Sequence, residues 1–86
     1  MSSEASFFSD LEGTMREAIE RAIPGAAVSV RGVGSGHFEI DVVSASFDGL
    51  TTLKRHRMVL SAIAHLMAGD SAPVHAIDRL STQTSG

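Results

Sequence analysis

The chain has 86 residues, enough for one small domain, and 43% of them are hydrophobic, enough to form a core. It contains no cysteine, so disulfides, thiolate nucleophiles and cysteine-ligated metal sites are excluded. The formal net charge of −3 argues against a generic nucleic-acid binder, and no apolar run is long enough to predict a membrane span. We therefore expect a soluble cytoplasmic protein in which only histidine or carboxylate side chains can bind a metal.

The first half of the chain predicts a helix followed by two strands. Residues 9–12 read as a capping box, apolar residues then recur at helical spacing, and Pro24-Gly25 ends the helix. Residues 1–8 are accordingly expected to form a flexible extension. Alternating apolar residues predict a short strand over 27–31 and a second strand from residue 37 to 43 or 44. Three glycines within residues 32–36 predict a hairpin connection between these strands.

The second half begins with a turn and a helix. Asp48-Gly49 is a turn signal, and from Leu53 onward apolar residues recur every three or four positions until Gly69 closes the helix. This spacing predicts one buried stripe, opposite a polar side made of Lys54, Arg55, Arg57 and Ser61. The residues expected in the buried stripe are Val59, Leu60, Ile63, Leu66 and Met67.

A third strand is predicted from residue 74 to about residue 81. Asp78 and Arg79 interrupt its apolar pattern, so we expect the strand to bulge or fray there. The single domain is expected to span residues 9–82, and residues 83–86 are expected to form a flexible tail.

Basic residues gather at the start of the second helix, in a basic segment that consists of Lys54, Arg55, His56 and Arg57. The helix dipole is already positive there, so each cation is unfavourable by roughly 0.3–1 kcal/mol. A phosphate or a carboxylate from a partner would offset this cost and would also meet the free N–H groups of the helix start. The alternative is a solvated charge run that keeps the domain soluble.

The order of the elements brings two histidines together. The strands on either side of the basic helix form a β-α-β unit, which places them parallel with a right-handed crossover. If these two strands are neighbours, His37 and His75 open them at the same end of the sheet, and the basic segment lies at the opposite end. The alternative for each histidine is an ordinary strand residue with a satisfied ring nitrogen, because two histidines do not complete a metal shell.

Four motifs in order resemble the BolA family: GSGHFEIDVV, the turn in SASFDGL, the helix TTLKRHRMVLSAIAHL, and the late VHAI. Within that family, the chain resembles the short-loop, IbaG-like members. This resemblance implies an α+β fold that is BolA-like and similar to the type II KH domain. It has the order α-β-β-α-β, a three-stranded mixed sheet and helices on one face.

The resemblance also implies a function. BolA-like proteins pair with monothiol glutaredoxins and share a [2Fe-2S] cluster, to which the glutaredoxin and its glutathione supply thiolates. His75 matches the histidine of the V-H-A strand. Many relatives carry a second Cys or His where this chain has Gly34, so His37, of the HF pair, is the remaining candidate for the second ligand. The resemblance implies an adaptor, with no cofactor in the isolated chain, which we expect to be a monomer or a weak dimer away from membranes.

A nucleic-acid-binding transcriptional regulator that contacts DNA through the basic segment is the alternative function. Against it, the G-x-x-G loop of KH domains is absent, and three bases could neutralise only a few phosphates. We expect no catalytic residues, because no motif places a nucleophile beside a base.

Overall fold

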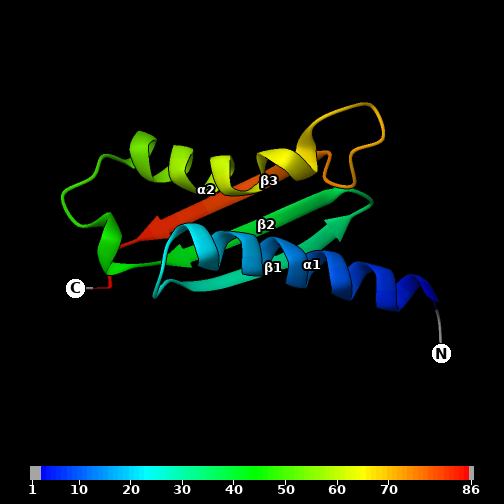
Figure 1. The fold of residues 1–86 in the computed structure, drawn as a ribbon, viewed down its shortest axis with the longest axis horizontal. Coiled ribbons are helices and arrows are strands. Elements are labelled where there is room, and N and C mark those ends of the chain that lie inside the picture. The colour runs from blue at the N-terminus through cyan, green and yellow to red at the C-terminus, as the bar shows by residue number, and fades with distance from the viewer. Residues whose placement is uncertain (1–2, 86) are drawn as a thin grey trace.

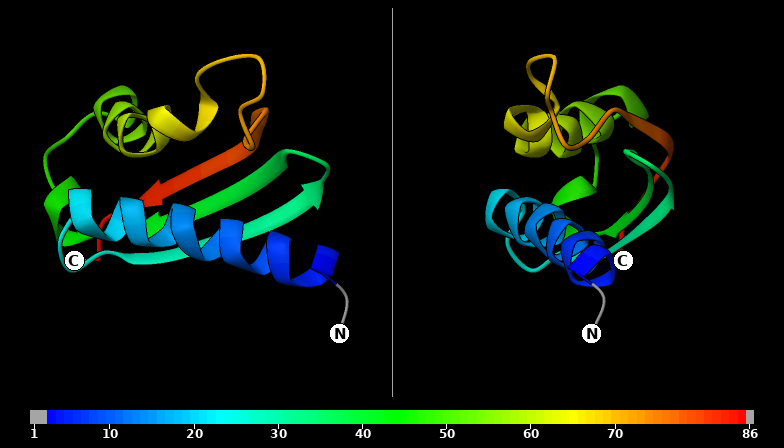
Figure 2. Two further views of the ribbon diagram at one scale, coloured as in Figure 1. Left: turned by 45° about the vertical axis from the view of Figure 1, so that its right-hand side comes forward. Right: turned by 90° about the vertical axis from the view of Figure 1, so that its right-hand side faces the viewer.

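The computed structural model describes the backbone of residues 3–85 and the side chains of residues 10–85. Its elements are α1 (Ser3–Ala22), β1 (Ala27–Gly34), β2 (His37–Val43), the short 3-10 helix η1 (Ala45–Phe47), α2 (Thr52–Met67) and β3 (Ala76–Gln83). The strand order is β1-β2-β3, with β1 antiparallel and β3 parallel to β2. Both helices lie on one face of this mixed sheet (Figure 1 and Figure 2). The predicted α+β fold is therefore confirmed.

The core lies between the helices and the sheet. In β2, the alternating residues Phe38, Ile40 and Val42 face the helices and are buried, whereas Glu39 and Asp41 lie on the open face. α1 and α2 each add an apolar stripe at helical spacing. The buried apolar side chains are Leu11, Met15, Ala18, Ile19, Ile23, Phe38, Ile40, Val42, Phe47, Val59, Ile63 and Val74.

The start of α1 differs from the prediction. The helix begins at Ser3, so residues 3–8, which we expected in the extension, are helical and Ser9 lies inside the helix. No glycine or proline occurs before Gly13, so nothing in this stretch stops the helix. Glu12 does not close a capping box, because its carboxylate accepts a hydrogen bond from the backbone N–H of Gly32, 2.7 Å away.

In α2, the buried face is narrower than the apolar spacing predicted. Thr51 caps the helix by accepting a hydrogen bond from the N–H of Lys54 (3.2 Å), and Val59 and Ile63 are fully buried as expected. Leu60, however, is 38% exposed. It lies roughly a quarter of a turn around the helix from the centre of the stripe formed by Val59 and Ile63, at the margin of the buried face.

β3 begins at Ala76 and ends at Gln83, two residues later at each end than predicted. The carbonyl of Gln83 accepts a hydrogen bond from the N–H of Ser44 (2.9 Å), so this residue belongs to the sheet and not to a flexible tail. The predicted bulge is confirmed: Phe38 pairs with Ile77, but the next residue of β2, Glu39, pairs with Arg79. Asp78 is thus one extra residue in β3.

Candidate functional site

The turn that joins β1 to β2 fixes the position of His75. This turn is formed by Ser35 and Gly36, and Gly36 is buried with φ +75°, a conformation that favours glycine. The carbonyl oxygen of Gly36 accepts two hydrogen bonds, from the N–H of His75 (2.8 Å) and from the N–H of Ala76 (3.1 Å). The segment that enters β3 is therefore held against the hairpin turn.

The His75 ring packs on the backbone of the same glycine. A Cβ atom placed on Gly36 would lie 2.7 Å from both Cγ and Nδ1 of His75, which is closer than such atoms ever approach. His75 is nevertheless exposed to solvent. The turn therefore supports one side of the imidazole and leaves the rest accessible.

His37 lies at the same corner of the sheet. It is the first residue of β2, directly after Gly36, and its partner across the parallel ladder is Ala76, directly after His75. Its side chain is 47% exposed, and its Nδ1 lies 2.9 Å from Oδ1 of Asp78. The hairpin turn and the start of β3 lie side by side at one end of the molecule (Figure 1 and Figure 2). We call His37 and His75 together the histidine edge.

The histidine edge offers two nitrogen ligands and no more. Among the residues that the structure describes, no group of three or more histidine, cysteine, aspartate or glutamate side chains could hold a metal ion. His65, near the end of α2, is exposed and forms no such group with the histidine edge. A complete shell at this edge would need ligands from another molecule.

On the open face of the sheet, the nearby carboxylates are already paired. Glu39 forms a salt bridge with Arg31, and Asp41 lies 3.8 Å from the same guanidinium. The hydrogen bond to Glu39, and then the charge of Glu39, raise the pKa of Arg31 above its ordinary value. These carboxylates bind Arg31, and among the side chains of residues 10–85 it is Asp78 that contacts the histidine edge.

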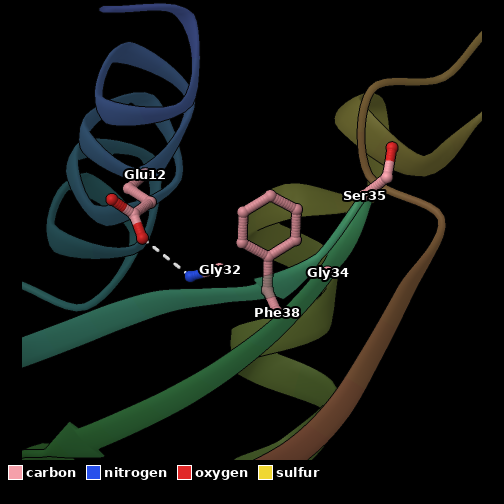
Figure 3. Close-up of a pocket in the computed structure, with 5 residues that line it drawn as sticks. All are labelled: Glu12, Gly32, Gly34, Ser35 and Phe38. Atoms are coloured by element: carbon pink, nitrogen blue, oxygen red, sulfur yellow. Dashed lines mark hydrogen bonds between the residues drawn. The ribbon is translucent and has the colours of Figure 1, made fainter. Parts of the chain in front are cut away.

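A cavity of about 430 Å³ lies on the other side of the hairpin, between α1 and β1 (Figure 3). Among the described residues it is lined by Glu12, Gly32, Gly34, Ser35 and Phe38. The Glu12 carboxylate is already bonded to the N–H of Gly32, and the Phe38 ring belongs to the core. No sequence pattern predicts this cavity, because its lining joins α1 to the hairpin through residues that are twenty positions apart.

The basic segment lies at the opposite end of α2 from the histidine edge, as expected (Figure 1). Lys54 and Arg57 are exposed and His56 is half-buried. Arg55, which we expected on the polar side, instead donates from Nε to the carbonyl of Leu50 (3.0 Å), and its guanidinium carbon lies 5.9 Å from the centre of the Phe47 ring. Through these two contacts, Arg55 links α2 to the residues that precede it, Phe47 and Leu50.

Comparison with known proteins decides the family. The model of the BolA family, described as BolA-like protein, matches residues 16–86. This span covers both strands of the hairpin, α2, β3 and the histidine edge. The chain belongs to the BolA family.

Relatives of known sequence and structure agree with this BolA assignment. BolA-like protein 1 of Homo sapiens is 34% identical over 76 residues, which cover 78% of this chain and 53% of that protein. The chain thus spans about half of the length of the curated relatives it matches. A BolA homologue from Coxiella burnetii has a TM-score of 0.68 and 34% identity, covering 85% of this chain and 88% of that structure.

The fold is also shared with more distant BolA structures. BolA1 from Arabidopsis thaliana has a TM-score of 0.73 over 86% of this chain and 90% of that structure, at 24% identity. Within residues 3–85, neither helix is both long enough and apolar enough to cross a membrane. The motifs GSGHFEIDVV, SASFDGL and TTLKRHRMVLSAIAHL lie on the expected hairpin, turn and helix. The motif VHAI starts before β3, so Val74 and His75 precede the strand in which we expected them. The contact between His37 and Asp78 was not predicted.

Proposed function

We propose that this BolA protein is an adaptor that pairs with a monothiol glutaredoxin and shares or transfers a [2Fe-2S] cluster as its cargo. The observation that carries the proposal is the histidine edge, where two exposed imidazoles lie at one corner of the sheet. Their ligand set is incomplete within the residues described, which suits a site that a partner completes.

The two histidines suit this cargo in chemistry as well as in position. Iron of a [2Fe-2S] cluster accepts imidazole in place of thiolate, and this replacement raises the reduction potential of the bound cluster. In the proposal, His75 and His37 supply nitrogen, and the glutaredoxin and its glutathione supply sulfur. An imidazole must be unprotonated at the nitrogen that binds metal, so a fall in pH would favour release.

The exposure of His37 and His75 to solvent supports an adaptor. A ligand pair at a solvent-facing edge, held on one side by the turn at Gly36, is open to a second protein and does not enclose a substrate. His75 has the more rigid support, since its N–H and its ring both contact Gly36. We therefore assign His75 as the principal ligand and His37 as the second.

A mixing experiment tests the proposal. The chain is combined with a monothiol glutaredoxin, glutathione, iron and sulfide, and visible circular dichroism is compared with that of the glutaredoxin alone. We expect a new spectrum that His75→Ala abolishes and that His37→Ala alters. His65→Ala, which removes another exposed imidazole, is the matched control and should change nothing. A spectrum that is the same with and without the chain, or that survives His75→Ala, contradicts cluster sharing.

A second candidate function, a nucleic-acid-binding regulator, is favoured by one observation. Lys54 and Arg57 are exposed on the first turns of α2, where they could contact phosphates. Arg55 is already bonded to Leu50 and stacked near Phe47, which leaves two exposed cations for such a contact. We therefore rank this function below the adaptor.

A further inference from the structure

The contact between His37 and Asp78 determines which ring nitrogen of His37 carries the proton. Nδ1 of His37 lies 2.9 Å from Oδ1 of Asp78, which is hydrogen-bond distance. A carboxylate can only accept hydrogen bonds, so the proton of the neutral ring belongs on Nδ1. The lone pair that could bind a metal is then on Nε2, the nitrogen that Asp78 does not contact.

The bulge in β3 is what brings Asp78 to this position. Phe38 and Glu39 are consecutive in β2, but their partners in β3, Ile77 and Arg79, are separated by one residue. Asp78 therefore has no partner of its own in β2, and its carboxylate reaches back to the ring at the start of β2 instead. Bulges commonly redirect a side chain in this way.

Stability alone does not account for this pair. The side chains of His37 and Asp78 are 47% and 44% exposed, and exposed ion pairs contribute little to folding. The paired carboxylates Glu39 and Asp41 already have Arg31 as a partner. What the contact does change is the orientation of the ring and the place of its proton, and both matter to a metal ligand.

We propose that Asp78 is a positioning residue for His37. Its carboxylate accepts the Nδ1–H of the imidazole, holds the ring at the histidine edge and leaves Nε2 as the atom presented to a metal. The identity of that metal rests on the proposed function, since the incoming ligand would be an iron of the shared cluster. The orientation itself does not, because Asp78 contacts His37 in the chain without any partner.

The tautomer of His37 tests the orientation directly. The chain is labelled with ¹⁵N-histidine, and two-bond ¹H–¹⁵N spectra are recorded without glutaredoxin at about pH 8, where free imidazole is neutral. We expect the wild-type His37 to show a protonated Nδ1 and a bare Nε2. In Asp78→Ala this pattern should be lost in favour of the Nε2–H tautomer, which histidine side chains prefer in water.

The other three histidines provide the controls within the same spectra. His56, His65 and His75 should keep their signals in Asp78→Ala. Asp48→Ala removes an exposed carboxylate from the loop at the other end of the sheet, and it should leave His37 unchanged. A protonated Nε2 on His37 in the wild type, or an identical pattern in Asp78→Ala, would overturn the proposal.

The cluster provides the second readout. With glutaredoxin, glutathione, iron and sulfide present, we expect Asp78→Ala and Asp78→Asn to lower the affinity of the complex for its cluster by about tenfold, measured by competition with a chelator. Wild-type retention in both variants would overturn a role of Asp78 in ligation. If the wild-type chain shares no cluster at all, the proposed function fails, and the tautomer spectra still decide whether Asp78 orients His37.

Discussion

His75 and Gly36 fit together so closely that position 36 has no room for a side chain. The ring atoms Cγ and Nδ1 of His75 would lie 2.7 Å from an added Cβ, and the Cβ of His75 itself would lie 3.1 Å away. The same glycine accepts both backbone hydrogen bonds that lead into β3. One residue of the hairpin turn thus sets the position of an imidazole that comes from the far end of the sequence.

Replacement of Gly36 should therefore disturb His75 as well as the turn. Gly36→Ala must adopt φ +75°, which costs about 1–2 kcal/mol for an L residue, and must also push His75 aside. Gly49→Ala is the matched control, because Gly49 has φ +77° and nothing within 4 Å of an added Cβ. We expect Gly36→Ala to destabilise the chain by about 1 kcal/mol more than Gly49→Ala in urea unfolding, and to shift the ring signals of His75. Equal losses with unchanged His75 signals would contradict this packing.

The hydrogen bond between Glu12 and Gly32 should hold the outer part of the hairpin against α1. Its length is 2.7 Å and its acceptor is a carboxylate, so we expect Glu12→Ala to cost about 1 kcal/mol. The specific readout is amide hydrogen exchange at Gly32, which should become faster. Glu17→Ala removes an exposed carboxylate from the same helix and should not affect that amide. Unchanged exchange at Gly32 in Glu12→Ala would argue against the bond.

Within the basic segment, Arg55 and Lys54 should behave differently. Arg55→Ala loses the hydrogen bond to Leu50 and the contact with the Phe47 ring, so we expect a loss of about 1–2 kcal/mol in unfolding free energy. Lys54→Ala removes an exposed cation and should change stability by no more than about 0.5 kcal/mol. Similar effects of the two substitutions on thermal unfolding would show that Arg55 does not link α2 to Leu50 and Phe47.

Binding to DNA, if the alternative function holds, should depend only weakly on salt. Two exposed cations, Lys54 and Arg57, could release about two counterions, which gives a slope of about −2 in log K against log salt. Titration of a labelled duplex at several salt concentrations measures this slope. The double variant Lys54→Ala, Arg57→Ala should abolish it. A much steeper slope, or one that the double variant retains, would place the contact elsewhere.

The sequence was sufficient for the architecture and for the placement of the two histidines at the same end of the sheet. Apolar spacing located both helices and all three strands, and the crossover rule for β-α-β units brought His37 and His75 to one end. The structure places His37 opposite Ala76, next to His75, although His75 precedes β3 and does not open it. That these residues bind a metal stays a prediction.

The predictions were wrong for side chains whose partners are distant in the sequence, and for one apolar residue at the margin of a helical stripe. The bond between Glu12 and Gly32 crosses from helix to hairpin, and local signals instead favoured a capping box. Arg55 was expected in solvent because charged residues usually are, but the loop before α2 offers it a carbonyl and a ring. Leu60 fits a three-and-four spacing, which fixes the direction of the buried stripe but not its width.

Because of the bulge in β3, the residue that contacts His37 is not one of the residues that pair with β2. Ile77 and Leu80 pair with Phe38 and Ile40 on the helix-covered face, yet two residues lie between them where regular alternation has one. A shortened chain that lacks Asp78 would place Arg79 directly after Ile77 and keep the pairing of β3 with β2 in register. One insertion or deletion in β3 can therefore add or remove the acid beside His37, while Ile77 and Leu80 keep their places opposite Phe38 and Ile40.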